Sequence, residues 1–227
     1  MHEKEAILVA HGAPANPVPQ EQTMQALAVR VAMWLPGWRI RGATLAQPNA
    51  LEAALAALKA PLIYPFFMAE GWFTRTNLPR RLAAANSAAL TQLAPFGTDP
   101  ALPDLMAQEA RKAGGDAGLL IAAHGSKVSK TSSDTTYQMV ESLKARGFAQ
   151  VRAGFVEEAP FLADVAQDMR GGTCLPFFAL RASHVVQDVP EALKEAGFQG
   201  PLLPPIGEAG SVAKLIAAAL ERAIRAP

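Results

Sequence analysis

Three residues in the second half of the chain carry side chains suited to metal and proton chemistry. His124 follows an apolar run in the stretch LIAAHGS, and His184 lies in the stretch PFFALRASHVVQDVP, with Glu157 between them. Imidazole nitrogens bind borderline divalent metals such as iron, cobalt, nickel and zinc, and a carboxylate adds charge and basicity. Histidine also exchanges protons near neutral pH. These residue types therefore suit reversible metal binding combined with proton transfer.

The single cysteine narrows the metal chemistry further. Cys174 has no second cysteine to pair with, which excludes an internal disulfide, an all-cysteine zinc site and an iron–sulfur cluster within one chain. A structural zinc site normally has four closed ligands. We expect Cys174 to be a buried small apolar residue in a strand. Histidine and glutamate are left as the residues that could bind a divalent metal weakly, release it and accept protons.

The residues around His124 have a counterpart in the first half of the chain. Short stretches recur in the same order at a nearly constant offset, close to half the chain length, which indicates an internal duplication rather than unrelated units with similar local chemistry. The matched pairs are ILVAHGA (7–13) with LIAAHGS (120–126), WRIRGATL (38–45) with QVRAGFV (150–156), YPFF (64–67) with LPFF (175–178), LP (78–79) with VP (189–190), and PFG (95–97) with PIG (205–207).

Each half predicts the same alternation of strands and helices. A short apolar strand (6–10 or 119–123) ends in His-Gly and is followed by a helix near 21–33 or 132–146. A second strand, a helix near 51–59 or 161–168, and a third strand ending in Pro-Phe-Phe come next. A helix then begins near Leu-Pro or Val-Pro, where proline suits the first turn, and a fourth strand near 95 or 202 leads to the last helix.

This alternation predicts an α/β fold with a parallel sheet covered on both faces. We expect two similar halves, each a four-stranded parallel sheet flanked by helices, related by a pseudo-two-fold axis. The domains would be 1–114 and 115–227, joined at the Gly-rich polar stretch KAGGD (112–116). Their length of roughly 110 residues each lies within the usual domain size.

The candidate chemistry lies in the loops that follow the strands, where open α/β sheets bind ligands. When the two halves are aligned, the second half has more side chains that can bind a metal or a proton. We therefore expect one complete site, in 115–227, and an incomplete one in 1–114. The pairs are His11 with His124, Ala46 with Glu157, and Phe73 with His184.

Composition excludes several classes of protein. Half of the 227 residues are hydrophobic, so a substantial core is possible without disulfides. The net charge of +1 argues against a nucleic-acid partner, which usually requires a basic excess. No apolar stretch is long enough for a membrane span or a secretory signal. We therefore expect a cytoplasmic protein with a reduced thiol, no nucleic-acid or membrane partner, and a monomeric or homodimeric state.

The motifs together resemble a known family. AHGS (123–126), followed by PFF-x₅-H-x₄-VP (176–190), is similar to the class II tetrapyrrole chelatases in their two-domain form, which include the sirohydrochlorin cobalt- and ferrochelatases. The resemblance covers essentially the whole chain in two copies. It implies a chelatase-like fold and insertion of divalent cobalt or iron into a sirohydrochlorin-type tetrapyrrole, in cobalamin or sirohaem biosynthesis.

The resemblance also assigns roles to residues. His124 and His184 would hold the incoming metal and help to remove pyrrole protons, and Glu157 would assist as an acidic residue. Two departures stand out: Ala182 and Ser183 occupy a region where the family usually has glycine, and Phe73 replaces a first-half histidine. Glycine permits a positive φ at no cost, so the loop before His184 is expected to take its own path.

A sirohydrochlorin-type substrate carries many carboxylates and would require local positive charge. Arginine forks bind carboxylates at two points, and lysines add point charges. The candidate substrate-binding residues follow AHGS, lie in the loop of His184, or lie in the matching first-half region; they are Ser126, Lys127, Lys130, Arg181 and Arg75, with Arg80 and Arg81 beside the last.

Other interpretations stay open from the sequence. The same scaffold could serve as a non-catalytic tetrapyrrole or metal carrier. A hydrolase or phosphatase using His124 with Ser126 is disfavoured because no G-x-S-x-G stretch is present, and no Walker A motif calls for a nucleotide. His124 and His11 could be loop histidines bonded to backbone, and Glu157 could be a solvated carboxylate at a helix start.

Overall fold

The computed structural model describes residues 4–85, 90–115, 118–169, 171–181 and 184–225, without the side chains of residues 184 and 185. The chain forms two compact units. Unit 1 consists of residues 1–99 and 210–227, and unit 2 is the continuous segment 100–209.

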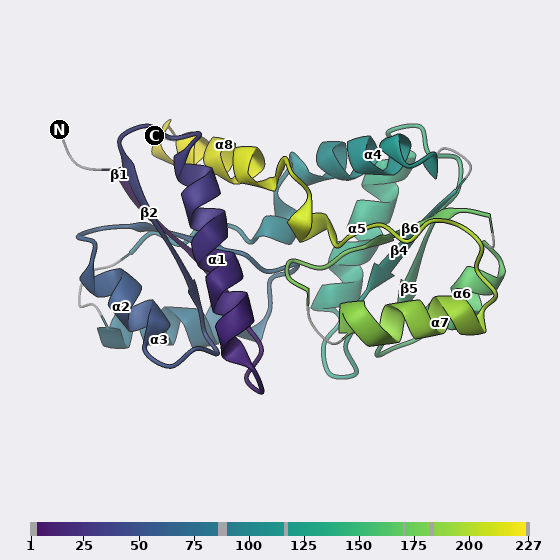
Figure 1. The fold of residues 1–227 in the computed structure, drawn as a ribbon, viewed down its shortest axis with the longest axis horizontal. Helices are drawn as coiled ribbons and strands as arrows, with labels where there is room; N and C mark the ends of the chain where they lie inside the picture. The colour runs from purple at the N-terminus through teal and green to yellow at the C-terminus, as the bar shows by residue number, and fades with distance from the viewer. Residues whose placement is uncertain (1–3, 86–89, 116–117, 170, 182–183, 226–227) are drawn as a thin grey trace. The chain divides into compact units, whose positions relative to one another are not determined.

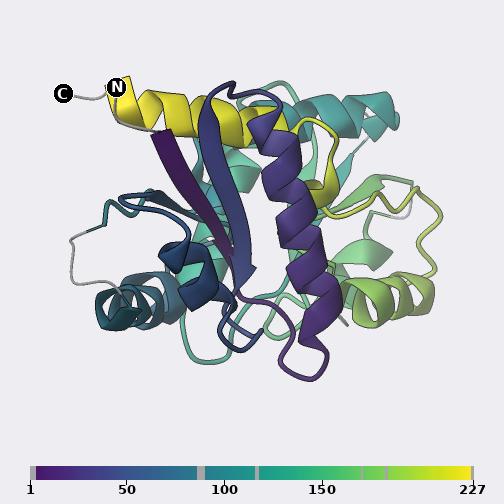
Figure 2. The ribbon, with the colours of Figure 1, turned by 60° about the vertical axis from the view of Figure 1, so that its left-hand side comes forward.

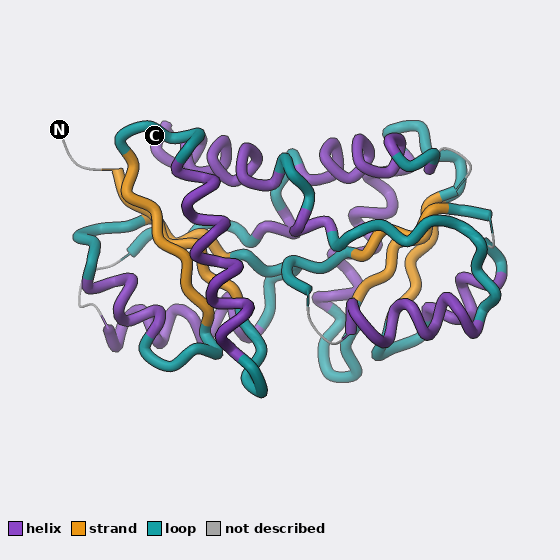
Figure 3. Tube along the Cα trace, viewed as in Figure 1, coloured by secondary structure: helices purple, strands orange, loops and turns teal. Residues whose placement is uncertain are grey.

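Unit 1 is built on a three-stranded parallel sheet with the strand order β2-β1-β3 (Figures 1 and 3). The central strand is buried from Glu5 to Ala10, as its apolar sequence predicts. The strands are β1 (Lys4–Ala10), β2 (Trp38–Thr44) and β3 (Leu62–Pro65). The helices are α1 (Pro17–Ala32), α2 (Ala50–Ala56), the π-helical turn η1 (Phe73–Asn77), α3 (Leu78–Ala85), the 3₁₀ turn η2 (Phe96–Thr98) and α8 (Val212–Arg225).

Unit 2 repeats this architecture, with the parallel strand order β5-β4-β6. Its central strand is buried throughout. The strands are β4 (Leu119–Ala123), β5 (Val151–Phe155) and β6 (Thr173–Pro176). The helices are α4 (Leu102–Lys112), α5 (Thr131–Lys144), α6 (Leu162–Gln167), the π-helical turn η4 (His184–Asp188), α7 (Val189–Glu195) and the 3₁₀ turn η5 (Ile206–Glu208).

The α/β class and the parallel pairing are confirmed, but the predicted four-stranded sheets are not. In the described residues, a single bridge stands where each fourth strand was expected: Ile63 with Gln92 in unit 1 and Cys174 with Leu202 in unit 2. Proline lacks the N–H that extends a ladder; Pro95 follows the bridge of unit 1, and Pro201, Pro204 and Pro205 surround that of unit 2. Each sheet therefore ends in a bridged loop rather than a strand.

Two helices lie in the unit opposite to the one that their place in the sequence repeat suggests. Helix α8 ends the second repeat, yet it packs against α1 of unit 1 (Figure 2). Its Arg222 binds the buried Asp99 of the same unit at 2.7 Å. Helix α4 ends the first repeat, yet it packs against α5, and Arg146 binds Asp104 at 2.6 Å. The division into 1–114 and 115–227 describes the sequence repeat and stays a prediction.

Cys174 is fully buried in β6, which confirms its predicted place in a strand. Burial raises the pKa of the thiol, so the reactive thiolate is scarce in the folded protein. Native protein at pH 8 should react with a thiol-specific reagent far more slowly than protein unfolded in guanidinium. Equal labelling rates in the two states, followed by absorbance, would contradict this burial.

In the described part of the chain, no helix combines the length and the apolar character needed to cross a membrane.

Candidate functional site

The loops after β1 and β4 are held by the same backbone hydrogen bonds. The Ala46 N–H donates to the His11 carbonyl at 2.9 Å, and the Glu157 N–H donates to the His124 carbonyl at the same distance. Residues after the second strand are thereby tied to the histidine after the first strand. The structure thus pairs His11 with His124 and Ala46 with Glu157, as the sequence alignment predicted.

The third-strand loops also correspond. In both units a π-helical turn follows the Pro-Phe-Phe strand end, and it begins at Phe73 in unit 1 and at His184 in unit 2. Short π-helical segments are rare and frequently occur at functional sites. The backbone therefore supports the pairing of Phe73 with His184.

The ring of His124 has a defined tautomer in this loop. Its Nδ1 lies 2.9 Å from the Gly125 carbonyl oxygen, and a carbonyl oxygen can only accept a hydrogen bond. Nδ1 therefore carries the proton, and Nε2 of the neutral ring holds the lone pair that a metal requires. His11 has the same contact with the Gly12 carbonyl, at 2.7 Å. The side chain of His124 is exposed, while His11 is half-buried.

Glycine after each histidine is required by the loop. Gly12 and Gly125 have φ values of +80° and +73°, a region that favours glycine. A Cβ added to Gly125 would lie 2.8 Å from Cγ of Glu158. The repeated His-Gly pair thus reflects a shared turn that directs each imidazole from the end of the central strand.

Glu158 holds this loop, a role that the sequence reasoning missed. Its Oε1 accepts a hydrogen bond from the Ser126 N–H at 2.9 Å. Burial and then the negative charge of Glu158 raise the pKa of Tyr137, which places the carboxylate beside that ring. The aligned residue of unit 1 is Gln47, whose buried Oε1 has no hydrogen-bond partner among the described residues.

Glu158→Ala should weaken cobalt binding by about tenfold, because Glu158 holds the loop of His124, the predicted metal ligand, and loss of a group that supports a metal ligand typically costs 10–100-fold. Glu158→Gln keeps an acceptor for the Ser126 N–H and should lose less. Cobalt titration followed by visible absorption measures both variants. Glu141→Ala, at an exposed carboxylate on α5, is the control. Wild-type affinity in Glu158→Ala would remove Glu158 from this role.

Four of the predicted site residues meet at one open pocket of about 510 Å³ in unit 2. They are Ser126, Lys127, Lys130 and Glu157. The Lys127 ammonium lies 3.5 Å from the Glu157 carboxylate, and the lysine side chain is 75% exposed. The pocket therefore brings together the Glu157 carboxylate and the exposed side chains of Lys127 and Lys130.

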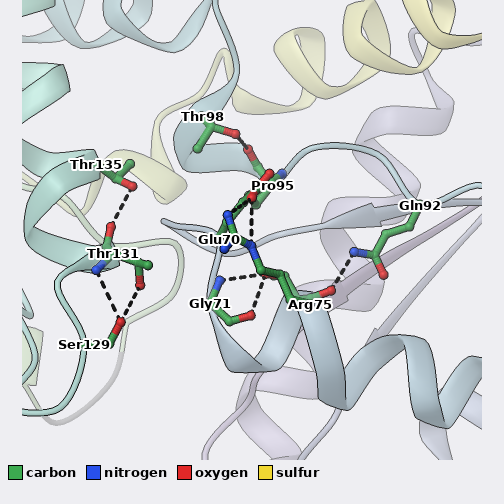
Figure 4. A network of polar contacts seen from close by, with 10 residues as sticks. Glu70, Gly71, Arg75, Gln92, Pro95, Thr98, Ser129, Thr131 and Thr135 are labelled. Carbon is green, nitrogen blue, oxygen red and sulfur yellow. Dashed lines mark hydrogen bonds and ion pairs between the residues drawn. The ribbon is translucent and has the colours of Figure 1, made fainter.

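The Ser126 hydroxyl is engaged in the turn itself. Its Oγ accepts hydrogen bonds from the N–H groups of Val128 and Ser129, each at 3.2 Å. Ser129 continues the polar chain through its hydroxyl to Thr131 at the start of α5 (Figure 4). These bonds give Ser126 a structural task, and they do not favour a hydrolase in which it would act as nucleophile.

Three of the four predicted arginines, Arg181, Arg75 and Arg81, bind carboxylates of their own units, with Arg81 paired to Glu52 at 2.9 Å. Arg181 forms a two-point pair with Glu208 at 2.9 and 2.7 Å, and this contact raises the pKa of the guanidinium. Arg75 binds Glu70 through Nε and Nη2 at 3.0 and 2.6 Å (Figure 4). A substrate carboxylate at any of these arginines would have to share or displace that arginine's partner.

The side chain of His184 lies outside the described part of the structure, as do residues 182 and 183. The described residues contain no cluster of three or more metal-ligating side chains. Unit 1 nevertheless shows what the scaffold does at these positions, because the rings of His11 and Phe73 lie 4.2 Å apart between centroids. The pairing of His124 with His184 stays a prediction that this geometry supports.

Two repeated parallel sheets, with a histidine presented at the end of each central strand, define a two-unit protein of the chelatase fold. A sequence model of the CbiX family matches residues 118–223. The chain is 47% identical to CbiX, the terminal enzyme for biosynthesis of siroheme in denitrifying bacteria, over 97% of this chain and 99% of that one, with a TM-score of 0.86. The chain belongs to the CbiX family.

Two further proteins are similar to this chain at lower identity. A probable sirohydrochlorin cobaltochelatase of Halobacterium salinarum is 23% identical over 220 residues, which span 82% of this chain and 75% of the relative. The sirohydrochlorin chelatase SirB of Bacillus subtilis subspecies spizizenii, solved with cobalt, shares the fold with a TM-score of 0.75 at 16% identity, covering 99% of this chain and 97% of that one.

Proposed function

We propose that this protein inserts divalent cobalt or iron into sirohydrochlorin, and so is a tetrapyrrole metal chelatase of sirohaem or cobalamin biosynthesis. The observation that carries the proposal is the loop cluster in which His124 presents Nε2 while the backbone N–H of Glu157 binds the His124 carbonyl. The 47% identity to a CbiX enzyme of siroheme biosynthesis supports the reaction, and cobaltochelatase relatives support the metal.

The reaction requires a metal to enter the macrocycle as two pyrrole protons leave. In this proposal, His124 and His184 bind the metal ion reversibly, since two imidazoles hold it less tightly than a closed four-ligand site. Glu157 or a histidine accepts the departing protons. Protonation of Glu157 weakens its pairing with Lys127, which frees the ammonium for a substrate carboxylate.

The proposal places one complete site in 115–227, because Ala46 and Phe73 stand where Glu157 and His184 stand in the second repeat. We assign binding of the substrate carboxylates to Lys127, Lys130 and Arg181 in the second repeat. The loop that contains Ser126, and Arg75 in the first repeat, also bind substrate in this proposal. The metal is a substrate and no permanent cofactor is involved. We place the reaction in the cytoplasm, and the protein acts as a monomer or homodimer.

The test mixes the protein with metal-free sirohydrochlorin and Co²⁺ or Fe²⁺ under anaerobic conditions. The absorption change of the macrocycle should accelerate in proportion to enzyme concentration and saturate with substrate. A rate equal to that without protein would refute a chelatase. Binding of macrocycle or metal without turnover would instead identify a carrier built on the same scaffold.

A further inference from the structure

An aromatic cluster in unit 1 occupies the position that corresponds to the predicted metal site of unit 2. The ring of Phe73 meets His11 edge-on at 4.2 Å, stacks near Phe67 at 6.2 Å, and meets Trp72 edge-on at 5.0 Å between centroids. These four residues come from the loop after β1, the end of β3 and the start of η1. We call them the aromatic cluster.

This cluster is poorly suited to metal chemistry. Phe73 offers no lone pair where the second repeat has a histidine, and Ala46 offers no carboxylate where it has Glu157. Metal binding here would rest on Nε2 of His11 alone, because Nδ1 is bonded to the Gly12 carbonyl as in His124. The loops of the two units thus share a backbone form, but unit 1 has aromatic side chains where unit 2 has the predicted metal ligands.

The outermost ring of the cluster is open to solvent. Trp72 is 57% exposed, whereas Phe67 and Phe73 are half-buried beneath it. Contact with Phe73 supports the indole ring, and a supported ring loses little conformational freedom on binding a ligand. Trp72 also lies in the loop after β3, at the carboxyl end of the sheet where α/β folds bind ligands.

A second exposed tryptophan provides an internal contrast. Trp34 is 54% exposed, but it lies between the end of α1 and the start of β2, at the amino end of that strand. The Lys214 ammonium lies over the Trp34 ring, 5.5 Å from the ring centroid. Exposure alone therefore does not distinguish the two residues, while position at the sheet end and aromatic support do.

We propose that Trp72 is a stacking surface for the flat face of the tetrapyrrole macrocycle. This inference rests on the proposed function and extends it to a substrate-binding residue outside the second repeat. A conjugated macrocycle offers a π face, which aromatic side chains bind by stacking. Arg75, three residues further along, is paired with Glu70, so a carboxylate at the rim of the macrocycle would bind it only by sharing or displacing that partner.

The test compares Trp72→Ala and Trp72→Phe with Trp34→Ala as the matched control. Affinity for metal-free sirohydrochlorin is measured by absorption titration, and KM and kcat for cobalt insertion are measured with each variant. Trp72→Ala should weaken binding by about fivefold or more and raise KM similarly, with kcat little changed, since one stacked base is typically worth 1–3 kcal/mol. Trp72→Phe should fall between, and Trp34→Ala should match the wild type.

Unchanged affinity and KM in a folded Trp72→Ala protein, with its melting curve intact, would overturn the stacking proposal. That failure is separable from failure of the proposed function. A wild-type protein that inserts cobalt while Trp72→Ala is unaffected refutes the stacking surface alone. A wild-type protein that binds the macrocycle through Trp72 without inserting metal refutes the chelatase alone, and one that does not bind the macrocycle refutes both.

Discussion

His124→Ala should insert cobalt into sirohydrochlorin about a hundredfold or more slowly than the wild-type protein, because the substitution removes the imidazole that we propose as both metal ligand and proton acceptor. The Nδ1–H of His124 donates to the Gly125 carbonyl, so Nε2 is the ring atom that can bind a metal, and the variant has no such atom. The measurement is the initial rate from macrocycle absorption at saturating substrate, with cobalt affinity determined in parallel.

The matched comparison is His11→Ala, which removes the same ring from the equivalent loop of unit 1. We expect its loss of rate to be at least tenfold smaller, because its aligned partners are Ala46 and Phe73. Residues that act as a unit are non-additive. His124→Ala combined with His184→Ala should therefore cost about as much as either alone, and substantial activity in the double variant would refute the site assignment.

Phe73→His should give the chain a second cobalt site. The His11 and Phe73 rings already lie 4.2 Å apart, so the replacement places two imidazoles within reach of one ion. Cobalt titration by calorimetry and visible absorption should rise from one bound equivalent to two. Adding Ala46→Glu, at the position aligned with Glu157, should tighten the new site, since a carboxylate adds charge to the ligand set.

The control for this gain is His11→Ala combined with Phe73→His, which keeps the new histidine and removes its neighbour. Its stoichiometry should return to one equivalent. If Phe73→His binds no more cobalt than the wild type while its melting temperature is unchanged, the two loops are not interchangeable as metal scaffolds, and the pairing of His124 with His184 loses its structural support.

The duplication was visible in the sequence because its markers are backbone requirements. Gly125 follows the histidine in a left-handed turn that needs glycine, so the His-Gly pair survives in both repeats. The Pro-Phe-Phe strand ends mark the third strand in the same way. These positions were enough to predict the α/β class, the order of the helices and of the first three strands in each half, and the pairing of His11 with His124.

Other features depend on contacts that the sequence pattern does not specify. Glu157 and Glu158 are adjacent carboxylates, and only the folded loop decides that Glu158 turns in to bind the Ser126 N–H. The exchange of α4 and α8 was equally hidden, because a helix at the end of a repeat has the same apolar pattern whichever unit it covers. The predicted fourth strands were wrong: each segment forms one bridge and then reaches a proline, Pro95 in unit 1 and Pro204 in unit 2.

Because α8 belongs to unit 1, unit 2 can be completed before unit 1 during synthesis. Domains generally fold as units, N-terminal first, as the chain emerges at about 5–20 residues per second. Here residues 100–209 contain all of unit 2, whereas unit 1 lacks α8 until residues 210–227 have been made. Residues 1–99 therefore precede unit 2 in synthesis but belong to the unit that is completed after it, and loss of residues 210–227 removes α8 from that unit.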